Sequence, residues 1–327
     1  MIKHKIVGKY WTQTTETDNS WNALIETDAG VIIAASADDR GLWYSEDNGI
    51  TWVQSNITTG SFNYLCQLYN NRIFAYKNSS NKYCSDDNGK TWHAIALTEL
   101  AVKISNGLLF TRGGRYSNDN GDTQYYPYGG STSSQGCDLF RLEDGRILQQ
   151  LGKWSANEGV NFDRGFSPVK VIINANCNNN TTFTTTVKKY MQSPFTHKVI
   201  ALTSAAIMSS DPTDLYTWQK LYNIIGNDYL SDVCIPNENA LLISTASKIL
   251  YSTNNGYTWT VSEAPAKAWT SLCVTRSGRV LACCDTGIYY SDPVNIQASI
   301  YSSLPVTGAQ AKEYVRQFKA YVQSLKT

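Results

Sequence analysis

One eight-residue pattern returns along this chain with little change. It reads SEDNGITW at residues 45–52, SDDNGKTW at 85–92 and STNNGYTW at 252–259. A pattern that recurs at a regular period more often builds an architecture than a catalytic centre. The recurrence therefore predicts a fold assembled from similar units.

Each copy of the pattern closes a longer unit. Residues 21–52 contain three short segments rich in β-branched and aromatic residues, each ended by Gly, Asn or Asp, and a fourth begins at Thr51. Related stretches follow at 62–92, 101–124, 137–162, 198–218, 229–259 and 269–295. Their turn serines recur about every 40 residues, and four strands at that period are typical of a propeller blade. We expect an all-β fold, a seven-bladed β-propeller.

The seventh unit lacks its last strand, and the start of the chain offers a replacement. GKYWTQ at residues 8–13 resembles GITWVQ at 49–54. We therefore expect residues 8–13 to pair as the outer strand of the last blade. Closure of this kind would leave the ring without an open end. The propeller is predicted to span residues 1–300.

The end of the chain has a different period. Ala311, Val315, Phe318, Val322 and Leu325 fall on one helical stripe. Residues 301–327 are therefore expected to hold a C-terminal amphipathic α-helix. This helix would either dock on the propeller or mediate self-association or attachment to a larger assembly, such as a virion.

The repeated octapeptide suits a structural role. Gly49 can adopt a positive φ, the Asp47 carboxylate can accept backbone N–H groups, and Trp52 can wedge between blades. The residues given this role are Ser45, Asp47, Gly49, Trp52, Ser85, Asp87, Gly89, Trp92, Ser252, Asn254, Gly256 and Trp259.

The pattern S-x-D-x-G-x-T-W is the Asp-box, and the chain resembles the sialidase-like Asp-box propellers, also called bacterial neuraminidase repeats. The motif is degraded at Ser117–Gln124 and at Ser155–Phe162. Asp-box propellers include hydrolases, lectins and scaffolds, so the motif indicates a fold rather than an activity.

An active sialidase, by that resemblance, would carry an arginine triad, a Tyr–Glu pair, an acid/base Asp and an Arg-Ile-Pro motif. The stretch before Ser45 has no such motif. Arg72 precedes Ile73 but is followed by Phe74, and the arginines of DGR and SGR turns, such as Arg279, are expected to be solvated. We predict no catalytic residue, no metal and no cofactor, with a sialidase-type exo-glycoside hydrolase as the alternative.

The blade face opposite the Asp-boxes is where propellers of this kind place ligands. The loop at 122–136 is rich in Tyr, Gly and Ser, and its tyrosines could stack on sugar rings. Packing on the propeller rim, or between blades, is the structural alternative for these aromatic residues. The candidate ligand residues are Tyr125, Tyr126, Tyr128, Arg115, Trp21, Phe62 and Trp269. The insertion at 164–190 could cover this face or meet a partner.

Charge excludes some partners. The net charge is +1 and charged residues are 17% of the chain, without a basic run, so we expect neither nucleic acid nor membrane insertion. The eight cysteines form no CxxC pair, and no signal peptide is recognisable. We therefore expect free thiols and folding in a reducing cytoplasm.

These features together resemble tail or virion-associated proteins of bacteriophages. The favoured function is a non-catalytic propeller that recognises a cell-surface carbohydrate, or a protein receptor, as part of such an assembly. The alternatives are the sialidase-type hydrolase and an assembly factor that binds a protein partner.

Overall fold

The computed structural model describes most of the chain up to residue 295. The described residues are 5–16, 19–77, 82–97, 101–103, 109–111, 115–125, 139–143, 147–149, 172–174, 187–203, 206–223 and 228–295. The described part is nearly all β-strand, with one short 3₁₀ turn at Tyr69–Asn71. The C-terminal helix expected at 301–327 lies outside the described residues.

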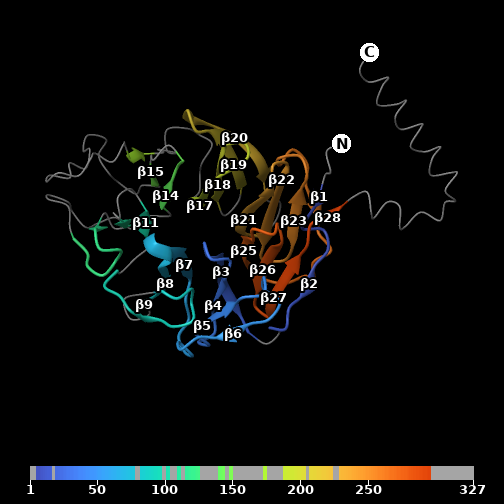
Figure 1. The fold of residues 1–327 in the computed structure, drawn as a ribbon. Helices are drawn as coiled ribbons and strands as arrows, with labels where there is room; N and C mark the ends of the chain where they lie inside the picture. The colour runs from blue at the N-terminus through green and yellow to red at the C-terminus, as the bar shows by residue number, and fades with distance from the viewer. Residues whose placement is uncertain are drawn as a thin grey trace, which may run out of the picture. The chain divides into compact units, whose positions relative to one another are not determined.

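Residues Val7–Asp292 form one compact unit of successive sheets, shown in Figure 1. Four of them are antiparallel meanders of four consecutive strands. Their strands are β3 (Trp21–Glu26), β4 (Ile32–Ser36), β5 (Leu42–Ser45) and β6 (Val53–Gln54); β7 (Tyr64–Gln67), β8 (Ile73–Tyr76), β9 (Lys82–Ser85) and β10 (His93–Ala94); β17 (Val187–Gln192), β18 (Val199–Thr203), β19 (Ala206–Asp211) and β20 (Asp214–Asn223); and β21 (Leu230–Asn237), β22 (Ala240–Thr245), β23 (Ile249–Ser252) and β24 (Thr260–Val261).

Two further sheets have three described strands each. One is antiparallel, with β11 (Ala101–Lys103), β12 (Leu109–Thr111) and β13 (Tyr116–Ser117). The other holds β14 (Leu139–Arg141), β15 (Ile147–Gln149) and β16 (Ile172–Asn174), and its β15–β16 pairing is parallel. This parallel pair departs from the meander of the other sheets.

The last sheet joins the two ends of the compact unit. Strands β25 (Trp269–Val274), β26 (Val280–Cys284) and β27 (Gly287–Ser291) are followed at the outer edge by β2 (Thr12–Gln13). Thr12 pairs with Tyr290 and Gln13 with Tyr289. The expected N-terminal strand over residues 8–13 thus has its counterpart in the two-residue strand β2.

A turn resembling an Asp-box is assembled at this edge from both ends of the compact unit. The Gly8 N–H donates to the Ser291 hydroxyl at 2.8 Å, as the Gly49 N–H donates to Ser45 at 2.9 Å. The Trp11 indole N–H donates to the Gly8 carbonyl at 2.9 Å. Gly8 has a φ of 90°. A side chain there would meet Leu242, since an added Cβ would lie 2.4 Å from its Cδ2.

Each sheet of the compact unit packs against the next one along the chain, and the β25–β27 sheet packs against the β3–β6 sheet. The core consists of apolar layers between neighbouring sheets. One layer joins Leu281 and Ile288 to Trp21 and Ile32, for example. Because each second strand is covered on both faces, Ile32–Ser36 is buried at every position. This architecture is that of a β-propeller.

A second, smaller unit consists of Met1–Ile6 and Pro293–Thr327. Its described strands are β1 (Lys5–Ile6) and β28 (Val294–Asn295), which pair antiparallel. Among the described residues, no helix is long and apolar enough to cross a membrane.

Candidate functional site

The Asp-box turns are held by one repeated set of hydrogen bonds. Asp47 accepts the Thr51 N–H at 2.8 Å, the Thr51 hydroxyl at 2.5 Å and the Ser45 hydroxyl at 2.8 Å. Partial burial alone would raise the pKa of Asp47, but these donors stabilise the carboxylate more strongly and lower it. The Asp47 carboxylate is therefore occupied within its own turn.

Two divergent copies keep the same bonding. Asn254 accepts the Thr258 N–H at 2.9 Å, and its amide donates to the Thr258 hydroxyl at 2.9 Å. Asp119 accepts the hydroxyl of Ser117 at 2.8 Å and the N–H of Thr123 at 2.8 Å. The turn at Ser117–Gln124, expected to be degraded, thus keeps its polar network and lacks only the tryptophan. The turn at Ser155–Phe162 lies outside the described residues.

The turn glycines show how closely each sheet meets the one before it. A Cβ on Gly49 would lie 2.7 Å from Leu281, and one on Gly89 would lie 2.1 Å from Ile33. Both partners belong to the second strand of the preceding sheet, as Leu242 does for Gly8. At Gly121 and Gly256 the nearest atoms belong to other positions, such as Ile95 and Leu221. We call the first three junctions closed, because the turn glycine packs directly on the preceding second strand, whereas each of the last two borders a cleft.

Two arginines link neighbouring turns. Arg279 forms a forked pair with Asp292 at 2.7 and 3.0 Å and donates to the Asn48 carbonyl at 2.9 Å. Arg72 forms the equivalent pair with Asp86 at 2.7 and 3.2 Å. Arg279 is only 9% exposed, so the expectation that arginines of SGR turns are solvated is wrong for this residue. It serves as a link between sheets.

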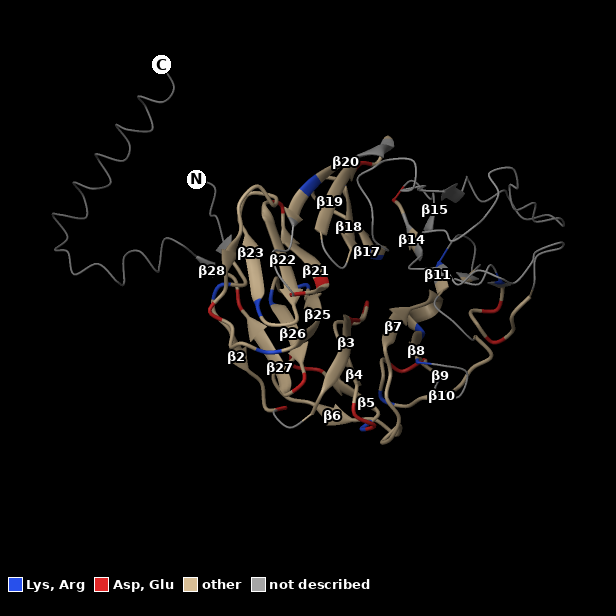
Figure 2. Cartoon of the chain, turned by 180° about the vertical axis from the view of Figure 1, so that it is seen from behind, with Lys and Arg blue, Asp and Glu red and all other residues tan. Residues whose placement is uncertain are grey.

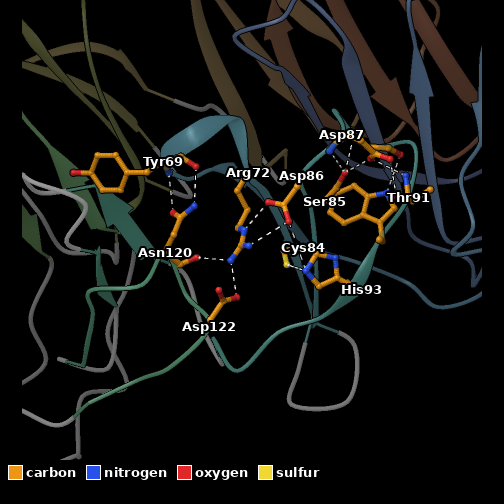
Figure 3. A network of polar contacts seen from close by, with 12 residues as sticks. Tyr69, Arg72, Cys84, Ser85, Asp86, Asp87, Thr91, His93, Asn120 and Asp122 are labelled. Atoms are coloured by element: carbon orange, nitrogen blue, oxygen red, sulfur yellow. Dashed lines mark hydrogen bonds and ion pairs between the residues drawn. The ribbon is translucent and has the colours of Figure 1, made fainter.

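Arg72 also reaches across to the next sheet, as Figure 3 shows. Its guanidinium donates to the Asn120 carbonyl at 3.2 Å and pairs with Asp122 at 2.6 Å. The carboxylates raise the already high pKa of Arg72 further, with the Asp86 hydrogen bond as the main cause. The Arg72 guanidinium therefore keeps its positive charge at neutral pH.

An open cleft of about 640 Å³ surrounds this link, and we name it the Arg72 cleft. Its lining includes Tyr69, Asn70, Arg72, Asp86, Asn118, Asp119, Asn120 and Asp122. Three carboxylates and one guanidinium thus line the cleft, and Lys103 lies 5.9 Å from the Tyr69 ring centre. The Asp86 and Asp122 side chains are 50% and 56% exposed, so the cleft presents negative charge to solvent.

A cysteine and a histidine lie beside the cleft but do not form a reactive pair. Cys84 Sγ lies 3.1 Å from His93 Nε2. Burial raises the pKa of Cys84 to about 11, so the thiol stays protonated near neutral pH. All six described cysteines are free, and five are buried. No group of three His, Cys, Asp or Glu side chains suited to a metal occurs among the described residues.

The inner strands carry an ion pair whose carboxylate is buried. Asp232, 5% exposed, pairs with Lys189 at 2.5 Å and accepts the Leu272 N–H at 2.8 Å. It also accepts the Ser271 hydroxyl at 3.1 Å. These partners come from β17 and β25, on either side of its own strand β21. Asp232 therefore ties three sheets together.

The aromatic ligand candidates at or just before the inner strands are core residues. Trp21, Phe62 and Trp269 are 0%, 0% and 1% exposed. Trp21 contacts Trp43 and Trp52, and Trp269 contacts Trp11 and Tyr289. Phe62 contacts Tyr83. Packing explains all three, and their rings offer no exposed face to a ligand.

The Tyr-rich loop is described only at its start. Tyr125 is 42% exposed. Arg115 lies near it in sequence and bonds Gln124 at 3.4 Å. Tyr126, Tyr128 and most of the 164–190 insertion lie outside the described residues, so a sugar site here stays a prediction.

Figure 2 shows that positions occupied by Lys or Arg and by Asp or Glu are interspersed, many of them in the turns between strands. The Arg72 cleft is absent from the sequence-based candidates. Two positions in the repeat could have indicated it. The first is an arginine directly before the second strand of a sheet, and the second is an acidic residue directly after the turn serine of the same sheet. That pairing occurs at Arg72 with Asp86 and at Arg279 with Asp292.

Comparison with known proteins supports the fold. A profile of the BNR/Asp-box repeat matches residues 83–94. No curated protein sequence matches the chain. The structure of YCF48 bound to D1 peptide is similar, with a TM-score of 0.59 and 15% identity over 88% of this chain and 95% of that one.

Two other similar structures belong to different kinds of protein. One is a catalytically inactive virginiamycin B lyase from Staphylococcus aureus with quinupristin, with a TM-score of 0.61 and 9% identity over 88% of this chain and 100% of that one. The other is the extracellular domain of the hybrid two-component system BT3049 from B. thetaiotaomicron. Its TM-score is 0.67, with 10% identity over 90% of this chain and 42% of that one. At these identities the likeness concerns the β-propeller fold alone.

Proposed function

We propose that this chain is a non-catalytic β-propeller of seven blades, closed by its N-terminal strand, that binds a segment of a protein partner. The observation that carries the proposal is the Arg72 cleft, where exposed carboxylates surround a guanidinium that is already paired. Such a cleft favours a segment with Lys or Arg side chains.

The state of four of the described arginines argues against sialidase chemistry. A triad that binds a substrate carboxylate needs free guanidinium groups. Arg72 and Arg279 are held by carboxylates and carbonyls, Arg276 bonds the Asp28 carbonyl, and Arg40 bonds Asn19. Each of these side chains already has a partner within the chain.

A protein partner is also plausible because a similar propeller, YCF48, was solved with a bound peptide. Glycan recognition, membership of a phage tail or virion and attachment through the C-terminal helix stay predictions from the sequence. The Arg72 cleft supports the peptide more directly, since Tyr69 and polar groups lie beside exposed carboxylates.

The test uses two pools of fluorescein-labelled 12-residue peptides. The basic pool carries Lys and Arg at the positions where the acidic pool carries Glu and Asp, and the pools are otherwise the same. Fluorescence anisotropy with the full chain should show binding of the basic pool, weakened by added salt. Asp122→Asn should weaken this binding about 2- to 5-fold, as expected for an exposed charge pair. Asp28→Asn, at another junction, is the matched control.

Two parallel assays can contradict the proposal. The chain is applied to a glycan array and incubated with a fluorogenic sialoside. Glycan binding without binding of either peptide pool would replace the protein partner by a saccharide. Turnover of the sialoside would show an enzyme instead.

A further inference from the structure

A second cleft lies at the junction between the β17–β20 and β21–β24 sheets. It measures about 100 Å³, and we name it the Tyr257 cleft. Its lining includes Lys198, Ile200, Ser209, Leu221, Asn255 and Tyr257. It is separate from the Arg72 cleft in position and in charge.

Comparison with a closed junction explains why this space is open. In the β25–β27 sheet, Arg279 stacks 4.1 Å from the ring centre of Tyr290 and bonds the carbonyl of Asn48 in the next turn. The strand pairing places Lys198 and Ser209 at the matching positions of the β17–β20 sheet. Lysine lacks the guanidinium fork and serine lacks the ring, so the chain does not fill the space itself.

The lining has one formal charge. Lys198 is its only charged residue, and no carboxylate lines the cleft among the described residues. Asp211 is close enough for the charge of Lys198 to help lower its pKa, although hydrogen bonds from Thr213 are the main cause. Those bonds, at 2.8 and 2.5 Å, hold Asp211 Oδ1 within its own turn. Lys198 forms no ion pair within 4.0 Å with a described residue.

Polar and apolar groups divide the rest of the cleft. The Ser209 hydroxyl has no hydrogen-bond partner among the described residues, although the residue is only 4% exposed. Because this hydroxyl lines the cleft, it is available to donate a hydrogen bond to a ligand. Ile200 and Leu241, 4% and 3% exposed, form an apolar wall, and Tyr257, 70% exposed, stands at the mouth.

We propose that the Tyr257 cleft binds the carboxylate of a peptide residue together with its aliphatic side chain, as at a free C-terminus. The carboxylate pairs with Lys198 and accepts the Ser209 hydroxyl, while the side chain lies on Ile200 and Leu241. The volume admits one such side chain. This proposal goes beyond the one for the Arg72 cleft and does not depend on it.

The probes are N-acetyl-L-leucine and N-acetyl-L-leucinamide, which differ only in the carboxylate. Saturation-transfer NMR with the full chain should show that the acid binds at least about fivefold more tightly than the amide, since a paired carboxylate favours the charged ligand. Lys198→Met should remove this preference. Lys90→Met, which removes an exposed lysine at an Asp-box turn of another sheet, should leave it unchanged.

A second variant fills the space from within. Lys198→Arg keeps the positive charge but supplies the guanidinium that bridges the closed junction, so it should weaken binding of both probes. Lys198 is exposed, and unchanged urea midpoints would show that these variants fold. Equal affinity for acid and amide, no binding of either probe, or full acid preference in Lys198→Met would overturn the proposal. The α-amide of N-acetyl-glutamic acid carries only a side-chain carboxylate. If it bound and N-acetyl-leucine did not, the natural ligand would be a glutamate side chain, and the C-terminal assignment would be overturned.

Discussion

Replacing Gly8 by alanine tests the junction that joins the two ends of the propeller. Gly8 has a φ of 90°, and an alanine Cβ there would lie 2.4 Å from Leu242 Cδ2 and 2.8 Å from Cγ. The backbone strain is worth roughly 1–2 kcal/mol. Forcing a methyl group against a fully buried leucine adds about 1–3 kcal/mol. We therefore expect Gly8→Ala to lower the free energy of unfolding by about 2–5 kcal/mol.

Gly30→Ala is the matched control for this substitution. Gly30 has a φ of 81°, but nothing lies within 4 Å of an added Cβ, so only the backbone term remains. Urea unfolding followed by tryptophan fluorescence should give a lower midpoint for Gly8→Ala than for Gly30→Ala. In the double variant Gly8→Ala/Leu242→Ala, the loss should be smaller than the sum of the two single losses, because the methyl group gains room.

Equal midpoints for the two alanine variants would refute the reasoning. They would mean that Gly8 does not press against Leu242 and that the N-terminal segment does not close the last sheet as described. An additive double variant would lead to the same conclusion.

Three further predictions concern the turns and the thiols. Arg279→Lys should lower the free energy of unfolding by about 1–3 kcal/mol in a urea titration, because bonds to a carboxylate and a carbonyl are lost; an unchanged midpoint would contradict the link between sheets. Asp47 has a lowered pKa in the folded state, so its stabilisation is complete above the unfolded value and is lost as the pH falls below about 4. Asp47→Asn, which imitates Asn254, should flatten the acid side of the stability curve, and an unaltered acid side in parallel urea titrations would show that the carboxylate is not responsible. Burial raises the pKa of Cys273 and Cys283 to about 12, so iodoacetamide at pH 8 should leave both unmodified in the folded protein; their labelling, mapped by mass spectrometry, would show that the core opens readily.

The Asp-box spacing was enough to predict the propeller fold, because the motif and the strands depend on local sequence. The turn at Ser117–Gln124 shows the limit of motif matching. Gln124 replaces the tryptophan, but the bonds of Asp119 depend only on Ser117 and Thr123. A motif judged as a whole therefore underestimates how much of a turn is retained.

The clefts could not be predicted in the same way. Arg72 and Asp122 are 50 residues apart and meet only because one sheet packs on the next. The opening near Tyr257 arises from Lys198 and Ser209, whose significance depends on their alignment with Arg279 and Tyr290. The two pairs of residues can be aligned only when the pairing of strands within both sheets is known, and the sequence does not give that pairing. Aromatic residues such as Trp21 were equally ambiguous, since a stacking ring and a core ring look alike in the sequence.

The bond between Gly8 and Ser291 joins residues 283 positions apart. During synthesis on the ribosome, Gly8 and strand β2 therefore emerge long before their partner strand β27 exists. The last sheet can be completed only when nearly the whole propeller has been translated, and contacts so distant in sequence form slowly. Until then the chain carries an unpaired edge, so truncated products should be prone to aggregation and the finished ring should unfold as a unit.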